Sequence, residues 1–427
     1  MKPSGDPILK SWLSADRGTD FPIQNLPFGI FRPKNRMNPR AGTRIGSTVI
    51  DLSVIAGKGY FADAGIADER IFSKPYLNDF IALGKSVRMN VRNKLTEIFN
   101  QENEEIWNTE DFYENLLFKS HEVEMLMPVK PSDYACFVSN AEYEAQVRTL
   151  FSAPDHKILS GWRTFPAGYH CRASSIVVSG TGIPRPYGQI LDESGKSIEF
   201  GPSRQLDFKP AIGIITGKST ALGDRIPVSQ AEDFIFGFVM LNNLAARDIQ
   251  KLESVPFGNF LSGNFGTVMS PWIIMPDALE PFRVKGPGQV PEPMSYLQYS
   301  GKGNYDLTLE VFIQPENESS QQVCSSGIKN MYWNIFQQLA HFTVTGCSIN
   351  AGDVFSSGTI GDTENNSGGL MPEPAHGRAN SMRPSDKSIK HFINDGETVI
   401  IKAFAENDEI RIGFGECKTK ILPAVPF

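Results

Sequence analysis

Short runs of β-branched and apolar residues recur along this chain, and glycine and proline separate them. Examples are residues 47–54, 176–180, 211–216, 234–241 and 398–404. With 38 glycines and 29 prolines, the spacing between such runs is typical of many strands joined by tight connections. The pattern predicts a mainly β protein of the α+β class, in which helices are few.

Three segments show helical periodicity. Apolar residues recur at helical spacing over residues 78–99, which predicts one long helix, and residues 110–118 and 331–343 predict two shorter ones. Beyond residues 121–131 the turn-rich β pattern dominates, so we expect two domains, 1–122 and 123–427.

Charge and composition exclude several classes of function. The net charge is −7, and no cluster of lysine and arginine suggests a nucleic-acid partner. No apolar stretch of about 18 residues predicts a membrane span. The five cysteines are widely spaced and form no C-x-x-C pair, which argues against a disulfide framework or a zinc site. We therefore expect a cytoplasmic protein with free thiols.

Several long strings are similar to the fumarylacetoacetate hydrolase family and follow that family's order. They include FPIQNLPFGIF (21–31), FPAGYHCRASSIVVSGTGI (165–183), AARDIQKLESVPFGNFL (245–261), NMYWNIFQQLAHFTVTGC (330–347) and GDVFSSGTI (352–360). The resemblance covers nearly the whole chain. It implies an N-terminal SH3-like small barrel, a C-terminal mixed β-roll and a homodimer.

The resemblance also implies where the family's cation would lie. That family holds magnesium or calcium with four carboxylates, and the cation polarises a carbonyl of the substrate. The matching positions in this chain are Cys136, Lys209, Ala211 and Asn243. None is a carboxylate, and a lysine ammonium repels a cation. We therefore expect no metal and no other cofactor.

The resemblance further assigns a catalytic dyad and substrate contacts. Tyr143 stands where the family has its histidine base, and Glu373 matches the glutamate that orients it. Gly263 replaces a lysine that stabilises the oxyanion, and Ser152 and Ser254 replace an arginine and a tyrosine. Residues that match the family's substrate contacts are retained, namely Arg247, Gln250, Tyr169 and Thr359.

Three hypotheses follow. The first is a metal-independent enzyme that acts on a small oxygen-rich or carboxylate substrate by C–C bond, enolisation or cyclisation chemistry. Specialised metabolite biosynthesis is one setting for such an enzyme. Its catalytic residues would be Lys209, Tyr143 and Glu373, and Asn243 and Cys136 would join the retained substrate contacts. The second is a non-catalytic pseudoenzyme that binds a small acid or a partner protein. The third is a fumarylacetoacetate hydrolase with unusual site residues.

Two of these residues also have purely structural interpretations. Lys209 could form a buried ion pair with Asp207, Glu142, Glu144 or Glu373. Cys136 could be a packed thiol, because the sequence predicts no histidine beside it that would activate a nucleophile.

Overall fold

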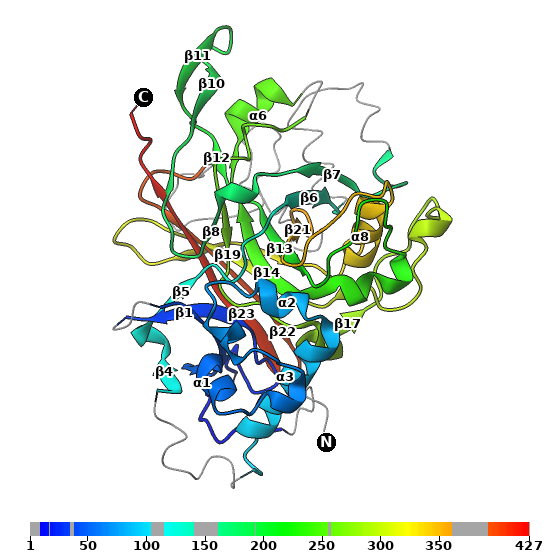
Figure 1. Cartoon of the computed structure of the whole chain (residues 1–427). Coiled ribbons are helices and arrows are strands. Elements are labelled where there is room, and N and C mark those ends of the chain that lie inside the picture. Colours follow the sequence, from blue (N-terminus) through cyan, green and yellow to red (C-terminus); the bar gives the residue numbers. More distant parts are fainter. Residues whose placement is uncertain are drawn as a thin grey trace.

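The computed structural model describes residues 9–16, 18–34, 38–103, 115–140, 161–192, 194–254, 258–360 and 392–426. The N-terminal part lies at the bottom of Figure 1 and the larger C-terminal part above it. We predicted a mainly β fold with an N-terminal SH3-like small barrel and a C-terminal mixed β-roll. It is confirmed as a small half-barrel sheet in the N-terminal part and mixed sheets in the C-terminal part.

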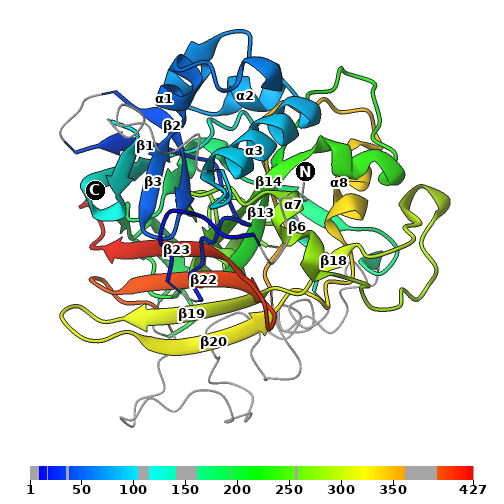
Figure 2. The same cartoon turned by 90° about the horizontal axis from the view of Figure 1, so that it is seen from below.

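An antiparallel sheet of five strands, in the order β4-β3-β2-β1-β5, forms the N-terminal part. Its strands are β1 (Gly29–Pro33), β2 (Arg40–Ile45), β3 (Thr48–Asp51), β4 (Leu117–Lys119) and β5 (Val123–Leu126). The domain boundary expected at residues 122/123 falls directly before β5, which pairs with β1. Three helices, α1 (Leu52–Gly57), α2 (Asn78–Ala82) and α3 (Lys85–Phe99), pack beside this sheet (Figure 2).

Two of the helix predictions need correction. The single helix expected over residues 78–99 is two helices, because Gly84 adopts a φ of 88° between α2 and α3. Glycine takes this left-handed conformation readily, and a helix cannot continue through it. Of residues 110–118, the first five lie outside the described residues, and Leu117 and Phe118 belong to strand β4 rather than to a helix.

A mixed sheet of seven strands forms the centre of the C-terminal part, in the order β7-β6-β21-β13-β14-β16-β8. The bounds are β6 (Tyr134–Val138), β7 (Ala167–His170), β8 (Ile176–Val178), β13 (Pro210–Thr216), β14 (Ile235–Asn243), β16 (Thr267–Met269) and β21 (Val354–Ser356). Both faces are covered. Ala211 and Ile215 pack with the apolar core of the N-terminal part, whereas Ile212 and Ile214 pack on the opposite side. This alternation along β13 separates the two cores.

A second C-terminal sheet lies across the molecule, in the order β20-β19-β22-β23-β9 (Figure 2). It contains β9 (Ile183–Pro184), β19 (Thr308–Gln314), β20 (Gln321–Gly327), β22 (Thr398–Glu406) and β23 (Arg411–Leu422). The remaining strands form pairs, β10 (Tyr187–Leu191) with β11 (Ile198–Pro202), β12 (Leu206–Asp207) with β15 (Ala245–Ala246), and β17 (Arg283–Val284) with β18 (Asn304–Tyr305). The β10–β11 hairpin projects from the body of the molecule in Figure 1.

Among the described residues of the C-terminal part, three α-helices accompany these sheets, α6 (Arg247–Glu253), α7 (Pro276–Leu279) and α8 (Ile335–Thr343). The helix expected over 331–343 begins later, because Asn334 is its N-cap and accepts hydrogen bonds from the amides of Phe336 and Gln337. The Gln337 side chain in turn accepts from the Asn334 amide, which completes a capping box.

We expect Asn334→Ala to lower the free energy of unfolding by about 1 kcal/mol, since two amides of the first turn of α8 lose their acceptor. Urea denaturation measures the change. The matched control is Gln298→Ala, whose exposed side chain donates to Glu292, and we expect an effect within about 0.5 kcal/mol. Equal effects of the two substitutions would contradict the role of the cap.

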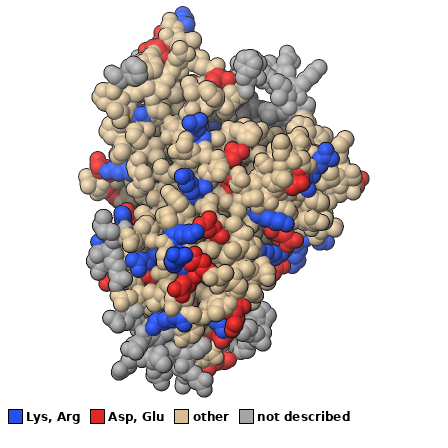
Figure 3. Space-filling model, in the orientation of Figure 1, with Lys and Arg blue, Asp and Glu red and all other residues tan. Residues whose placement is uncertain are grey.

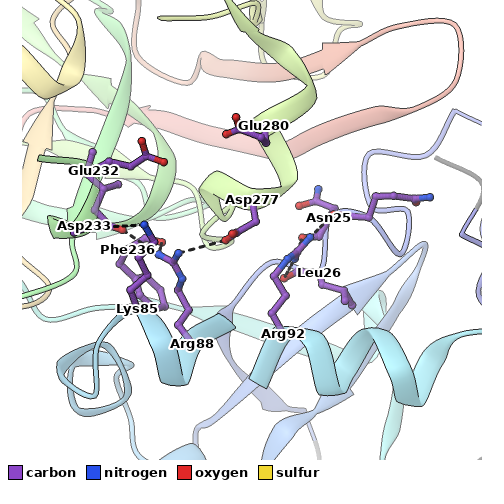
Figure 4. Close-up of polar contacts among 12 residues, drawn as sticks. Asn25, Leu26, Lys85, Arg88, Arg92, Glu232, Asp233, Phe236, Asp277 and Glu280 are labelled. Atoms are coloured by element: carbon purple, nitrogen blue, oxygen red, sulfur yellow. Dashed lines mark hydrogen bonds and ion pairs between the residues drawn. The ribbon is translucent and has the colours of Figure 1, made fainter. Parts of the chain in front are cut away.

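Two arginines of α3 join parts of the chain that are distant in sequence (Figure 4). The Arg88 guanidinium donates to the carbonyls of Ile235 and Phe236, at 3.0 Å each, and pairs with Asp277 at 3.3 Å. Arg92 lies one turn further and donates to the carbonyls of residues 24–26. Burial lowers the pKa of the Arg92 guanidinium to about 10, so it stays charged at neutral pH. The two arginines thus hold α3 against both the C-terminal sheet and the turn that precedes β1.

The surface drawn in Figure 3 intersperses lysine and arginine with aspartate and glutamate. That face therefore presents no large field of one sign. Within the described part of the chain, no helix combines the length and the apolar character that a membrane crossing requires.

Candidate functional site

Neighbouring strands of the seven-stranded sheet bring several predicted site residues together. Cys136 on β6 pairs in register with Tyr169 on β7 and with Ser356 on β21. Lys209 directly precedes β13, and its carbonyl accepts a hydrogen bond from the Asn243 amide at 3.0 Å. Asn243 ends β14 and pairs with Thr267 on β16. The site is thus assembled from five strands of this sheet and from the residue that leads into β13, which lies between β21 and β14.

Lys209 is buried, with 3% of its surface exposed. Its Nζ donates to the Tyr169 hydroxyl at 3.4 Å and lies 6.0 Å from the centre of that ring. Asp207, one of the carboxylates considered as an ion-pair partner of Lys209, forms an ion pair with Arg247. The other three candidates, Glu142, Glu144 and Glu373, lie outside the described residues. Lys209 therefore places a buried ammonium beside the half-buried phenol of Tyr169.

Cys136 lies against a second thiol, which the sequence analysis overlooked. The Cys171 Sγ donates to the Cys136 Sγ, and the two sulfurs are 2.6 Å apart. Burial raises the pKa of the Cys136 thiol, but hydrogen bonds from Cys171, Tyr134 and Ser356 and the charge of Lys209 bring it below its ordinary value. The hydrogen bond to Cys136 and burial raise the pKa of Cys171. Of the two thiols, Cys136 therefore loses its proton more readily than Cys171.

Asn243 is held by hydrogen bonds from neighbouring side chains. Its carbonyl oxygen accepts from the Tyr134 hydroxyl and, at 3.4 Å, from the Thr267 hydroxyl, and its amide donates to the Ser356 Oγ at 3.1 Å. Burial raises the pKa of Tyr134 well above its usual value, so this phenol stays protonated and donates. The Asn243 carbonyl oxygen is thus already engaged by two protein hydroxyls.

The side chains at the four positions matched to cation ligands do not fit magnesium or calcium. They present a thiol, an ammonium, a methyl group and an amide, whereas these hard cations require several oxygen ligands, mostly carboxylates. Ala211 is fully buried in the apolar core. Over the described ranges, no group of three or more His, Cys, Asp or Glu side chains is arranged to hold a metal ion.

Arg247 and Gln250 belong to a buried polar network at the start of α6. Arg247 donates from Nε and Nη2 to Asp207, at 2.9 and 2.7 Å, and from Nη1 to the Gln250 Oε1 at 2.8 Å. The Gln250 amide donates to Asn259 at 2.9 Å, and the Ser254 hydroxyl donates to the Gln250 carbonyl. The network thus fixes the orientation of the Arg247 and Gln250 side chains. Their contact with a substrate stays a prediction.

Thr359 lies close to Lys209. It is buried, and the amide of the next residue, Ile360, donates to the Pro210 carbonyl at 3.1 Å. Gly358 precedes it with a φ of 92°, and a Cβ there would lie 2.3 Å from the Phe137 carbonyl oxygen. Only glycine therefore lets this segment approach β6.

Gly263 lies in the chain after α6, and Tyr143, Ser152 and Glu373 fall outside the described residues.

The site thus contains four residues that the sequence analysis did not single out, Tyr134, Cys171, Thr267 and Ser356. One signal was present: Tyr134 and Cys136 are two apart in a β-type run and therefore share a face. The others become neighbours only through the pairing of strands.

Comparison with known proteins gives a consistent result over the whole chain. Residues 24–128 match the family model "Fumarylacetoacetase N-terminal", and residues 135–422 match "Fumarylacetoacetate (FAA) hydrolase C-terminal". Fumarylacetoacetase of Dictyostelium discoideum is 40% identical over 422 residues, covering 98% of this chain and 99% of the relative. The human fumarylacetoacetase is 36% identical over 417 residues, covering 97% and 99%.

A solved structure supports the same fold. The fumarylacetoacetate hydrolase from the psychrophile Exiguobacterium antarcticum matches with a TM-score of 0.52 at 17% identity, covering 93% of this chain and 99% of that one. With both family models matched in order and relatives similar from end to end, the chain belongs to the fumarylacetoacetate hydrolase family.

Proposed function

We propose that this protein is an enzyme that acts on a small, oxygen-rich carboxylate substrate, with the Lys209 ammonium in the place of a divalent cation. The observation that carries the proposal is the buried Lys209, whose Nζ lies 3.4 Å from the Tyr169 hydroxyl. A buried ammonium is costly unless a negative partner compensates it. An anionic substrate oxygen would be such a partner.

The chemistry that suits this site is the formation of an enolate. An ammonium and a phenol beside a substrate carbonyl would stabilise the negative charge that develops on its oxygen when a neighbouring carbon loses a proton. Enolisation, addition, cyclisation and C–C bond cleavage of a β-dicarbonyl compound all pass through such a charge. Tyr143 and Glu373 stay predicted as the groups that move the proton. A place in the biosynthesis of a specialised metabolite is compatible with such chemistry.

A second candidate function is the hydrolysis of fumarylacetoacetate itself. It is favoured by identities of 36–40% with fumarylacetoacetases over nearly the full length of the chain. A third candidate function is binding without turnover. Arg247, the residue predicted to bind the substrate carboxylate, is already in an ion pair with Asp207 and donates a hydrogen bond to Gln250.

One set of experiments separates these functions. The chelator-treated protein is analysed for bound metal and then incubated with fumarylacetoacetate, with and without added magnesium or calcium. In parallel, exchange of the methylene protons of acetylpyruvate, a β-dicarbonyl acid, is followed by NMR in deuterated water. We expect no bound metal and exchange that does not depend on metal. Metal-dependent hydrolysis of fumarylacetoacetate would overturn the proposal in favour of the second candidate. Binding without exchange or hydrolysis would leave a ligand-binding protein.

The assembly and location of the protein are also part of the proposal. We expect a homodimer in the cytoplasm, with a small molecule as the ligand of each site and no nucleic-acid or membrane partner. Sedimentation equilibrium measures the mass in solution, and a monomer at micromolar concentration would contradict the dimer.

A further inference from the structure

We propose that Cys136 and Cys171 form a covalent modification site, an intramolecular disulfide made on exposure to a hydroperoxide. This inference does not depend on the function proposed above. It rests on two sulfurs that lie 2.6 Å apart. That distance is about 0.6 Å longer than an S–S bond of about 2.0 Å.

The backbone brings the two cysteines together. Cys136 pairs with Tyr169 across the antiparallel strands β6 and β7, and Cys171 follows two residues later. The Cys171 amide donates to the Tyr134 carbonyl at 2.8 Å, which continues the same ladder. The cysteines therefore occupy diagonal positions on one face, where side chains of adjacent strands reach each other. Their side chains already bring the two sulfurs to within 2.6 Å of each other.

The surroundings assign a role to each sulfur. Cys136 receives hydrogen bonds and lies within the field of Lys209, so its thiolate is favoured and acts as the nucleophile. Cys171 is half-buried, whereas Cys136 is 3% exposed, so the pair is reached from solvent on the Cys171 side. This arrangement resembles a reactive thiol beside a resolving thiol.

The reaction balances in two steps. Cys136 first loses its thiol proton, and the thiolate attacks one oxygen of hydrogen peroxide. An S–O bond forms as the O–O bond breaks, and the leaving hydroxide takes up the proton that Cys136 released, which gives the first water. Cys171 then attacks the sulfur of the sulfenic acid, the S–S bond forms, and its thiol proton and the hydroxyl group leave as a second water. Overall, two thiols and one peroxide give one disulfide and two waters. A dithiol reductant reverses the change.

Peptide mapping of the wild-type protein tests the proposal without any substitution. The reduced protein is treated with hydrogen peroxide, blocked with an alkylating reagent, digested without reductant and analysed by mass spectrometry. We expect one peptide pair linked through Cys136 and Cys171, an intact mass lower by two hydrogen atoms, and recovery of both thiols with dithiothreitol. Two separately alkylated or separately oxidised cysteines, with no linked peptide, would overturn the proposal.

Substitutions show whether the loss of two hydrogens belongs to this pair. The Cys171→Ser and Cys136→Ser proteins should show no loss of two hydrogen atoms after peroxide treatment. Cys347→Ser is the matched control, because Cys347 is also half-buried but its Sγ donates to the Phe342 carbonyl at 3.2 Å. It should lose the two hydrogens as the wild type does. If Cys136→Ser, with an unchanged circular dichroism spectrum, still loses them, another pair is responsible and the proposal is wrong.

Discussion

Arg92→Met is expected to lower the free energy of unfolding by about 3 kcal/mol, because three buried carbonyls lose a charged donor. Arg92 is 1% exposed, and its guanidinium donates to the carbonyls of Gln24, Asn25 and Leu26. Leu26 has a φ of 40°, a conformation that costs energy for a residue with a Cβ. Figure 4 shows Arg92 reaching this turn from α3. The arginine therefore stabilises a strained turn that leads into β1.

Urea denaturation, followed by circular dichroism, measures this change. The matched control is Lys94→Met on the same helix. Lys94 pairs with Glu97 at 2.9 Å in a partly exposed position, and such pairs contribute less than about 1 kcal/mol. Similar stabilities of the two variants would show that the turn holds its shape without the guanidinium.

Lys209→Met is expected to weaken the binding of acetylpyruvate by roughly 10- to 100-fold, as the loss of a charged hydrogen bond predicts. The same substitution should leave the free energy of unfolding unchanged or raise it by about 1 kcal/mol. Methionine has nearly the length of lysine, and replacing a buried charge with an apolar side chain is often neutral or stabilising. Opposite effects on binding and stability are what a residue retained for function should show.

Isothermal titration calorimetry with acetylpyruvate and thermal unfolding provide the two measurements. Lys402→Met is the control, since Lys402 lies on β22 in a half-exposed pair with Glu416 at 3.2 Å. It should change neither quantity beyond about 0.5 kcal/mol. A Lys209→Met protein that binds normally but loses several kcal/mol of stability would identify Lys209 as a structural residue.

The candidate site illustrates which contacts a sequence can reveal. Cys136, Lys209 and Asn243 were found because each stands in a string similar to the family's, although their partners could not be read from those strings. The two faces of β13 could not be told apart in its almost wholly apolar run, and only the packing shows that Ala211 faces the core of the N-terminal part. The break between α2 and α3 was missed, because the periodicity of the apolar residues continues through Gly84.

By itself, the sequence determined the fold class, the family and the absence of carboxylates at four positions, because strings of residues and local periodicity carry that information directly. Only the tertiary structure decided that Cys171 meets Cys136, that Lys209 meets Tyr169 and that Arg247 is engaged by Asp207. These contacts depend on which strands pair and in which register. A shift of one residue would turn Cys136 to the opposite face of the sheet. Register follows from the packing of both cores at once, and no single segment of the chain encodes it.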